Sequence, residues 1–311
     1  MTEKIVLCEC FARDGLQHEN ALIPAATKIE AIDRFASLGF GRVEATSFTN
    51  PKNVPQFADA TEVLTGIVRR PGVRFKATCV NPRSVERALA AAVAGHGPEE
   101  ISVLLSASEA HTKRNLNRTP AEQWANVEAM IAAAAGQFVL VGTISVALGC
   151  PFEGHVDPAV VVADAERLAS LGVKLIAIGD TTGMGNPRTV QTLFRRLFDA
   201  VPGITPIAHF HDTRGTAIAN CVAAYEAGVR CFDSAFGGVG GHPVSISYGG
   251  GYTGNVCTED LVGVFSQMGI DTGLDLGRLI ETAQWCEQVL GRPLRGMVTR
   301  SGLANAGGKH G

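Results

Sequence analysis

Short apolar runs rich in Val, Ile and Phe alternate with amphipathic segments of helical period along most of the chain. The apolar runs predict eight strands, over residues 5–10, 42–48, 73–80, 100–106, 138–148, 174–179, 205–210 and 231–236. The amphipathic segments predict helices over residues 25–39, 58–68, 83–95, 120–135, 158–171, 187–200, 216–228 and 259–268. This alternation of strand and helix is typical of an α/β fold with parallel strands.

Eight βα units in unbroken order favour a closed (β/α)₈ TIM barrel over an open doubly wound sheet, because no linker divides the chain. Gly39 and Gly228 stand where helices would end in a left-handed residue. An apolar stripe over residues 274–290 predicts an extra C-terminal helix packed on the barrel. We therefore expect a single catalytic domain over residues 1–295, including this helix, and a flexible tail over residues 296–311.

One uncharged run, residues 130–152, is long enough to span a bilayer as a helix. It contains Gly136, Gly142 and Pro151, which favour an interrupted structure. We interpret it as the end of a helix at Ala135 followed by a buried strand, because central parallel strands are apolar on both faces. No membrane segment is expected.

Charge and cysteine content narrow the function further. The 27 Lys and Arg residues nearly balance the 30 Asp and Glu residues, and no basic block exceeds two residues, so we expect a small-molecule partner and no nucleic acid. The N-terminus lacks the basic and apolar segments of an export signal, and a cytoplasmic location is expected. The eight cysteines include no CxxC pair and are expected to be reduced thiols.

In such a barrel, catalytic groups lie at the C-terminal ends of the strands and in the loops that follow them. Polar residues at those positions are therefore the candidates for a site. They are Arg13, Asp14, Glu44, Ser47, Thr78, Ser106, Ser108, Thr143, Ser145, Asp180, His209, His211, Asp212 and Asn255.

His209 and His211 form the sharpest local feature, because residues two apart on a strand point to the same face. Two neighbouring imidazoles suit a divalent metal, and the alternative is that one histidine is a hydrogen-bonded core residue. Asp14 follows the first strand, which in a closed barrel neighbours the eighth. With the amide oxygen of Asn255, it gives a mixed donor set that favours Mg²⁺ or Mn²⁺, with Zn²⁺ or Co²⁺ as alternatives.

Three further charged side chains are candidates for the site. Arg13 is either a salt-bridge partner of Asp14 or a cation that stabilises developing negative charge, such as an enolate oxygen. Glu44 and Asp180 fall on strands, where burial of an unpaired carboxylate is costly. Lys76 on the third strand is the candidate partner of Glu44, and Asp180 either belongs to the site or caps the next helix.

Glycine-rich stretches over residues 237–243 and 249–255 follow the eighth strand. In this fold, such a region commonly binds phosphate or forms a lid, and the alternative is a flexible surface loop. His242 in the first stretch is a candidate acid.

Six motifs in this order resemble one known family. They are RDGLQHE at 13–19, SASE at 106–109, GCPFEG at 149–154, GDT at 179–181, HFHDT at 209–213 and GNVCTED at 254–260. The chain resembles the 3-hydroxy-3-methylglutaryl-CoA lyases, within the metal-dependent barrel group that also contains isopropylmalate and homocitrate synthases. The first three motifs favour the lyase branch over the condensing synthases.

The resemblance implies a divalent metal held by Asp14, His209, His211 and Asn255, and an acyl-CoA substrate. It implies retro-Claisen cleavage of a 3-hydroxyacyl-CoA to acetyl-CoA and a keto product, with Arg13 stabilising the enolate. The catalytic candidates are then Arg13, Asp14, Glu44, Asp180, His209 and His242. The substrate-binding candidates are Gln17, Ser47, Ser106, Ser108, Thr143 and Ser145.

One departure from the family pattern concerns the loop after the eighth strand. The lyases carry a cysteine there, in a Gly-Gly-Cys-Pro stretch, that is thought to protonate the enolate; here the stretch reads Gly240-Gly241-His242-Pro243. His242 can also carry a proton. The alternatives are a related substrate such as citramalyl-CoA, a condensing enzyme or aldolase that uses a 2-oxo acid, and a metal-binding barrel without activity. A homodimer is the oligomeric state we expect.

Overall fold

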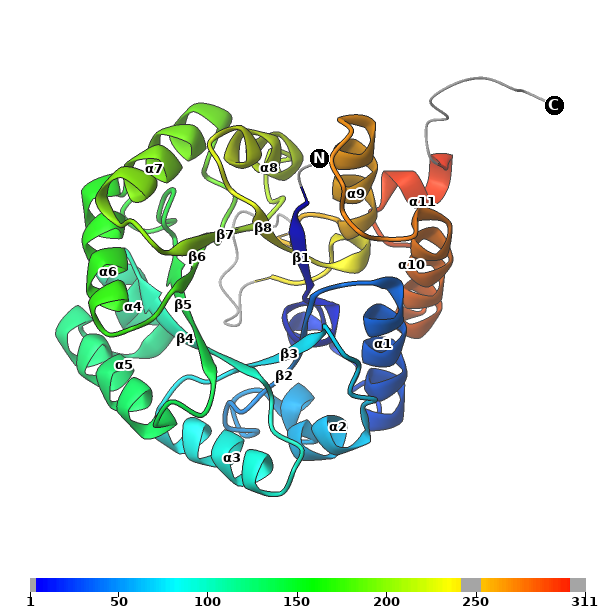
Figure 1. Ribbon diagram of the computed structural model, residues 1–311, viewed down its shortest axis with the longest axis horizontal. Coiled ribbons are helices and arrows are strands. Elements are labelled where there is room, and N and C mark those ends of the chain that lie inside the picture. Colours follow the sequence, from blue (N-terminus) through cyan, green and yellow to red (C-terminus); the bar gives the residue numbers. More distant parts are fainter. Residues whose placement is uncertain (1–3, 242–252, 303–311) are drawn as a thin grey trace.

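The computed structural model describes residues 4–241 and 253–302. Eight parallel strands pair in chain order and the last closes onto the first, so the predicted barrel is confirmed (Figure 1). The strands are β1 (Val6–Glu9), β2 (Arg42–Ser47), β3 (Arg74–Thr78), β4 (Glu100–Ser106), β5 (Val139–Ser145), β6 (Leu175–Asp180), β7 (Thr205–Phe210) and β8 (Cys231–Ser234).

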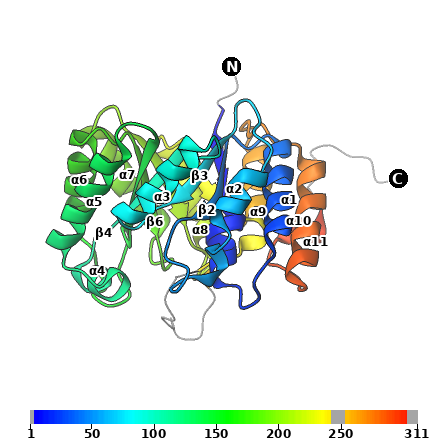
Figure 2. The same ribbon diagram turned by 90° about the horizontal axis from the view of Figure 1, so that it is seen from below.

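Helices surround the barrel on the outside (Figures 1 and 2). They are α1 (Ala25–Leu38), α2 (Ala60–Gly66), α3 (Pro82–Val93), α4 (Glu109–Leu116), α5 (Pro120–Ala134), α6 (Pro158–Ser170), α7 (Pro187–Ala200), α8 (Ala217–Glu226), α9 (Thr258–Gln267), α10 (Leu276–Leu290) and α11 (Met297–Ser301). Short helical turns cover Phe11–Gly15, Leu16–His18, Pro55–Phe57 and Phe236–Gly238.

Local sequence signals set the helix ends. Helices α3, α5, α6 and α7 begin with proline, and the residue before each proline accepts a backbone N–H with its side chain. Gly39 and Gly228, with φ of 107° and 108°, adopt the predicted left-handed conformation just after α1 and α8. Capping therefore determines where these helices start and stop, while their apolar faces pack on the barrel.

Beyond shifts of one or two residues at element ends, the structure differs from the predicted elements in three places. Strand β5 ends at Ser145, three residues early, because Val146 has a φ of 51° that an extended strand does not allow. Helix α4 was not expected; it buries only His111 and Thr112, so it lacks an apolar stripe. Helix α11 lies in the segment expected to begin the tail, and its first N–H groups donate to Asp260.

The C-terminal helix predicted over residues 274–290 forms as α10. Residues 130–152 form the end of α5, then β5 and the loop after it, as interpreted from the sequence. No helix within residues 4–241 and 253–302 is both long enough and apolar enough to cross a bilayer.

Side chains inside the barrel change character along its axis. A small apolar cluster of Val141, Ala177, Ile207 and Cys231 occupies one level. Two residues further along the strands, on the same face, come the polar residues His209 and Asp233, which pair in register on β7 and β8. The barrel thus places polar groups toward the C-terminal ends of its strands.

Candidate active site

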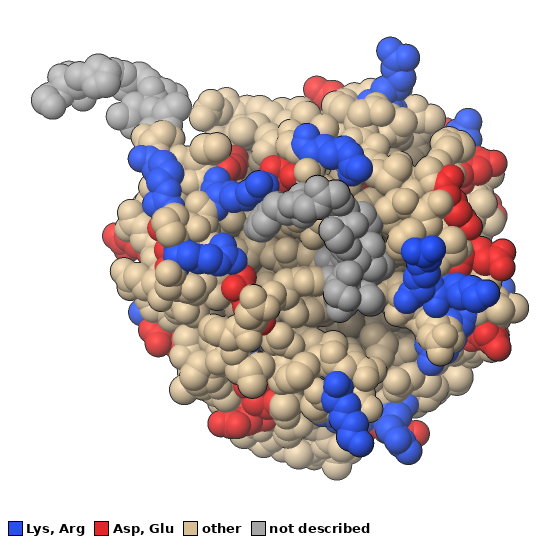
Figure 3. All heavy atoms as spheres, turned by 180° about the vertical axis from the view of Figure 1, so that it is seen from behind, with Lys and Arg blue, Asp and Glu red and all other residues tan. Residues whose placement is uncertain are grey.

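A cavity of about 560 Å³ opens at the C-terminal ends of the strands. The surface seen from this side is hollowed near its centre, with Lys and Arg side chains spread around the hollow (Figure 3). Eight residues singled out from the sequence line the cavity: Arg13, Asp14, Gln17, Thr78, Thr143, Ser145, His209 and His211. The barrel therefore brings together groups almost two hundred residues apart in sequence.

Asp14, His209 and His211 place their potential ligand atoms within 4.8 Å of one another. The Nε2 atoms of the two histidines lie 3.3 Å apart, and His211 Nε2 lies 3.8 Å from Asp14 Oδ2. The two imidazoles meet because His209 lies near the end of β7 and His211 follows it by two residues. These three residues form a group that can hold a metal ion.

The outer nitrogen of each imidazole already has an acceptor. His209 Nδ1 lies 3.2 Å from Asp233 Oδ2, and His211 Nδ1 lies 2.5 Å from the carbonyl oxygen of Thr253. We assign the ring proton to Nδ1 in both, since a carboxylate and a carbonyl accept hydrogen bonds. Both Nε2 lone pairs then face the same space, and burial lowers the pKa of His211 to about 4, which keeps it neutral. Neutral imidazoles oriented in this way are typical metal ligands.

Asn255 is the candidate for a fourth donor. Its Nδ2 donates to Asp14 Oδ2 at 2.6 Å and to the carbonyl oxygen of Val239 at 3.0 Å. Its Oδ1 is buried and has no hydrogen-bond partner among the described residues. A buried polar atom without a partner is costly, and an oxygen ligand suits a hard divalent cation. The donor set of one carboxylate, two imidazoles and one amide oxygen therefore fits such an ion.

Arg13 is held between two carboxylates at the edge of the cavity. Its guanidinium contacts Asp14 Oδ1 at 2.6 Å and Glu44 Oε2 at 2.8 Å. Burial opposes ionisation of Asp14, but Arg13 and the two histidines outweigh it and hold the pKa of Asp14 well below its usual range. The salt-bridge interpretation is thus correct in geometry, and Arg13 also reaches the cavity.

Glu44 lies behind Arg13 and is fully buried. Its Oε1 accepts the hydroxyl proton of Thr78 at 2.8 Å and lies 3.5 Å from Lys76 Nζ, so the predicted Lys76 pair is present. Burial opposes ionisation here too, but Arg13 and Lys76 lower the pKa of Glu44. Its contacts orient Arg13 and do not bring it to the cavity lining.

Asp180 is not brought into the cavity. It pairs in register with Phe210, one residue beyond the Gly179–His209 pair, so its side chain lies on the other face of β6. Its carboxylate accepts N–H groups of Met184 at 2.8 Å and Gly185 at 3.0 Å, and burial raises its pKa to about 6. Neither interpretation from the sequence matches this geometry: Asp180 is not among the residues that line the cavity, and the cap of α7 is Asn186, so Asp180 instead binds the backbone of the loop between β6 and α7.

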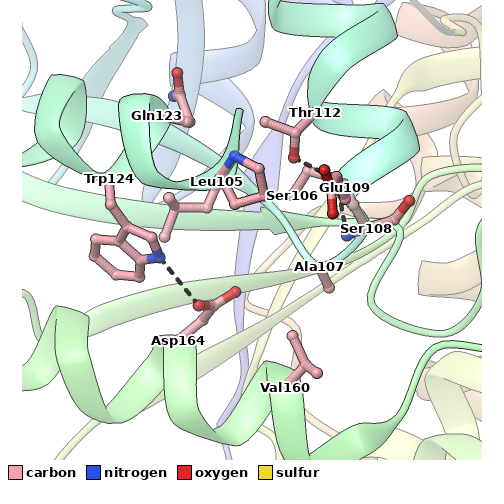
Figure 4. Close-up of a pocket in the computed structure, with 11 residues that line it drawn as sticks. Leu105, Ser106, Ala107, Ser108, Glu109, Thr112, Gln123, Trp124, Val160 and Asp164 are labelled. Carbon is pink, nitrogen blue, oxygen red and sulfur yellow. Dashed lines mark hydrogen bonds between the residues drawn. The ribbon is translucent and has the colours of Figure 1, made fainter. Parts of the chain in front are cut away.

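Two serines expected to bind substrate lie elsewhere. Ser106 Oγ is 2.8 Å from His111 Nδ1, and Ser108 caps α4 by accepting the His111 N–H at 3.1 Å. Both line a separate cavity of about 250 Å³, together with Trp124 and Asp164 (Figure 4). These contacts anchor α4, and neither serine is among the residues that line the larger cavity, so binding of substrate by Ser106 and Ser108 stays a prediction.

Ser47 is buried and shares a 2.7 Å hydrogen bond with Thr49, which itself lines the larger cavity. His242 lies outside the described residues. Sequence reasoning missed Asp233, although the same signal that selected Glu44, a carboxylate on a predicted strand, was present there. Strand parity would also have placed Asp233 inside the barrel.

The comparisons with known proteins agree with this fold. The chain matches the HMGL-like family over residues 4–286. It is 37% identical over 302 residues to "Hydroxymethylglutaryl-CoA lyase, mitochondrial" of Rattus norvegicus, covering 97% of this chain and 90% of the relative. It is 36% identical over 311 aligned residues to the "(R)-citramalyl-CoA lyase" of Chloroflexus aurantiacus, covering 96% of this chain and 95% of the relative.

Among solved structures, an HMG-CoA lyase from Acinetobacter baumannii in complex with coenzyme A and 3-methylmalate superposes with a TM-score of 0.91. It is 34% identical and covers 99% of this chain and 98% of its own. Similarity of this extent covers the whole barrel and not one motif. The chain therefore belongs to the HMGL-like family of carbon–carbon lyases.

Proposed function

We propose that the protein cleaves a 3-hydroxyacyl-CoA by retro-Claisen chemistry into acetyl-CoA and a keto product. The observation that carries this proposal is the cluster of Asp14, His209, His211 and Asn255, with Arg13 beside it at the edge of one cavity. Relatives named for HMG-CoA and citramalyl-CoA, and a related structure that contains coenzyme A, support an acyl-CoA substrate.

We propose that Asp14, His209, His211 and Asn255 hold Mg²⁺ or Mn²⁺, because two of the four donors are hard oxygen atoms; Zn²⁺ and Co²⁺ are the alternatives. When bound, such an ion would polarise the C3 hydroxyl group and lower its pKa. Asp233 and the Thr253 carbonyl keep both imidazoles in the tautomer that leaves Nε2 free.

In the reaction, the C3 hydroxyl gives its proton to water in the cavity and C3 becomes a carbonyl carbon. The C2–C3 bond breaks, and its electron pair forms the enolate of acetyl-CoA. Arg13 supplies a fixed positive charge for the enolate oxygen, held in place by Glu44. Protonation at C2 completes acetyl-CoA, and His242 is the proposed acid. We expect His242→Ala to lose turnover, which tests this role.

The acyl group is the finer part of the proposal. Thr143, Ser145 and Gln17 line the cavity and offer hydroxyl and amide groups to a carboxylate on the acyl chain. We take 3-hydroxy-3-methylglutaryl-CoA as the first candidate and citramalyl-CoA as the second. Citramalyl-CoA stays a candidate because the citramalyl-CoA lyase relative is similar over nearly the full length of both chains. A cytoplasmic location and a homodimer remain predictions.

The test is cleavage of both thioesters with Mg²⁺ or Mn²⁺, with and without EDTA, followed by release of acetyl-CoA. We expect cleavage that EDTA abolishes and that Asp14→Asn abolishes. Asp164→Asn, in the separate cavity, is the matched control and should retain activity. Full turnover by metal-free protein, or thiol release only from acetyl-CoA with 2-oxo acids, would contradict the proposal.

A further inference from the structure

Lys76 on β3 is a buried cation between two buried carboxylates, below the cavity. Its Nζ lies 3.5 Å from Glu44 Oε1 and 3.5 Å from Asp233 Oδ2, and its side chain is only 3% exposed. Burial alone would lower the pKa of Lys76, but the two carboxylates outweigh it and raise the pKa above its ordinary value. Lys76 is therefore charged, and it is not among the residues that line the cavity.

Strand register explains why Lys76 reaches both partners. Lys76 on β3 is directly opposite Glu44 on β2, and Asp233 on β8 is directly opposite His209 on β7. All four side chains point into the barrel, so Lys76 can reach across the interior to Asp233. A long side chain with a compact charged end suits this bridging position.

One branch of contacts runs from Lys76 toward the enolate. Glu44 uses Oε1 toward Lys76 and Oε2 toward Arg13, at 3.5 and 2.8 Å. Arg13 in turn contacts Asp14 Oδ1 at 2.6 Å. The position of the Arg13 guanidinium thus depends on a carboxylate that Lys76 partly neutralises.

The other branch runs from Lys76 toward the metal-binding group. A single oxygen of Asp233, Oδ2, contacts both Lys76 Nζ at 3.5 Å and His209 Nδ1 at 3.2 Å. Arg42 approaches the other oxygen, Oδ1, at 3.5 Å. The carboxylate that fixes the tautomer of His209 is therefore itself held by two cations.

We propose that Lys76 is a positioning residue that joins the two halves of the site: through Asp233 it orients the metal-binding face of His209, and through Glu44 it orients Arg13. This inference rests on the proposed metal site. The alternative is that Lys76 only neutralises buried charge for stability, as any buried lysine would. The two explanations predict different metal affinities for a folded variant that lacks the Lys76 charge: only a positioning role predicts weaker binding.

The test is Mn²⁺ binding to metal-free protein, measured by titration calorimetry, for the wild type and Lys76→Met. We expect the dissociation constant to rise about 10- to 100-fold, as for loss of partners behind a metal ligand. Lys28→Met is the matched control, because Lys28 is equally buried and pairs with Asp59 at 2.9 Å, away from the cavity. Equal affinity in wild type and folded Lys76→Met would overturn the inference.

A second variant, Asp233→Asn, removes only the branch toward His209. It also tests the inference if Lys76→Met does not fold. Asp233→Asn should weaken Mn²⁺ binding by itself, and Lys76→Met should add little in the Asp233→Asn background. In long-range ¹H–¹⁵N spectra of the metal-free protein, His209 should lose its Nδ1–H form in both single variants. Unchanged affinity and an unchanged tautomer in Asp233→Asn would also overturn the inference. Wild-type protein that binds Mn²⁺ without cleaving any thioester would contradict only the proposed function.

Discussion

At the scale of single residues, the cavity separates atoms that can hold a cation from a group that can stabilise an anion. Asp14 touches both groups, because Oδ1 contacts Arg13 and Oδ2 accepts from Asn255. A carboxylate shared in this way lets the two groups lie next to each other without repulsion. Variants of Arg13 and of the metal-binding residues should therefore have different effects on metal affinity.

Arg13→Met should lower kcat by about a hundred- to a thousand-fold, the range seen when one donor to a developing oxyanion is removed. Mn²⁺ affinity should be equal or higher, because Asp14 loses a competing cation. Steady-state kinetics and calorimetry measure the two effects. Arg87→Met is a control, since Arg87 stacks on Phe48 outside the cavity lining. A variant with normal kcat and weakened Mn²⁺ binding would reverse our assignment of Arg13.

Gly240 approaches the same group closely. Its φ is 118°, and an added Cβ would overlap Asn255 Nδ2 and lie 3.1 Å from Asp14 Oδ2. We expect Gly240→Ala to weaken Mn²⁺ binding at least about tenfold, because Asn255 must move. Gly269→Ala is the matched control: Gly269 also has a positive φ, of 75°, but its Cβ would meet no atom within 4 Å. Equal Mn²⁺ affinities in the two variants would show that the close approach is unimportant.

At the scale of elements, periodicity predicted the eight strands and the helices that carry apolar stripes, because burial of those stripes drives their packing. Helix α4 escaped prediction because caps and polar contacts, not an apolar face, hold it in place. Asp180 was ambiguous for a related reason. A carboxylate at a strand end can point into the barrel or away from it, and only the register with β7 decides.

Substitutions of Ser108 and Ser145 distinguish a serine that stabilises a helix from one that binds substrate. Ser108→Ala removes the α4 cap and the 2.5 Å contact to Glu153, so it should lower the unfolding free energy by about 1 kcal/mol or more and leave KM nearly unchanged. Ser145→Ala, at the end of β5 in the cavity lining, should raise KM and leave stability nearly unchanged. Denaturant unfolding and kinetics on both variants measure this, and the opposite pattern would restore Ser108 as a substrate-binding residue.

At the scale of the whole molecule, the barrel closes between its first and last strands, and Glu9 lies at this closure. It is fully buried at the end of β1. Its Oε1 accepts N–H groups of Phe11 at 2.9 Å and of Phe236 at 3.0 Å, while Oε2 shares a 2.6 Å hydrogen bond with Thr258 Oγ1. One carboxyl group thus ties the turn that carries Asp14 to the loop after β8 and to α9. Sequence alone did not single out Glu9, because its role depends on which strands meet at the closure.

Burial raises the pKa of Glu9 from an ordinary value near 4.5 to about 8. Between these values the folded protein keeps a proton that the unfolded chain has lost. The stabilisation is therefore complete below about pH 4.5 and decreases as the pH rises toward 8, by about 1.4 kcal/mol per pH unit for one proton. Burial also raises the pKa of Glu259, which makes stability fall with rising pH in the same way. The effect of Glu9 is therefore measured as the difference in stability between the wild type and a Glu9 variant.

Glu9→Gln provides that difference. A glutamine is close in shape to the neutral acid: its Oε1 can accept from Phe11 and Phe236, and its amide can donate to Thr258 Oγ1, whose own proton then goes to Ser234 Oγ, 2.8 Å away. We expect the variant to be about as stable as the wild type near pH 5 and more stable at pH 8, in urea unfolding at both values. If Glu9 were instead ionised in the folded protein, the Glu9→Gln variant would be less stable than the wild type at both pH values. That result would contradict the raised pKa of Glu9.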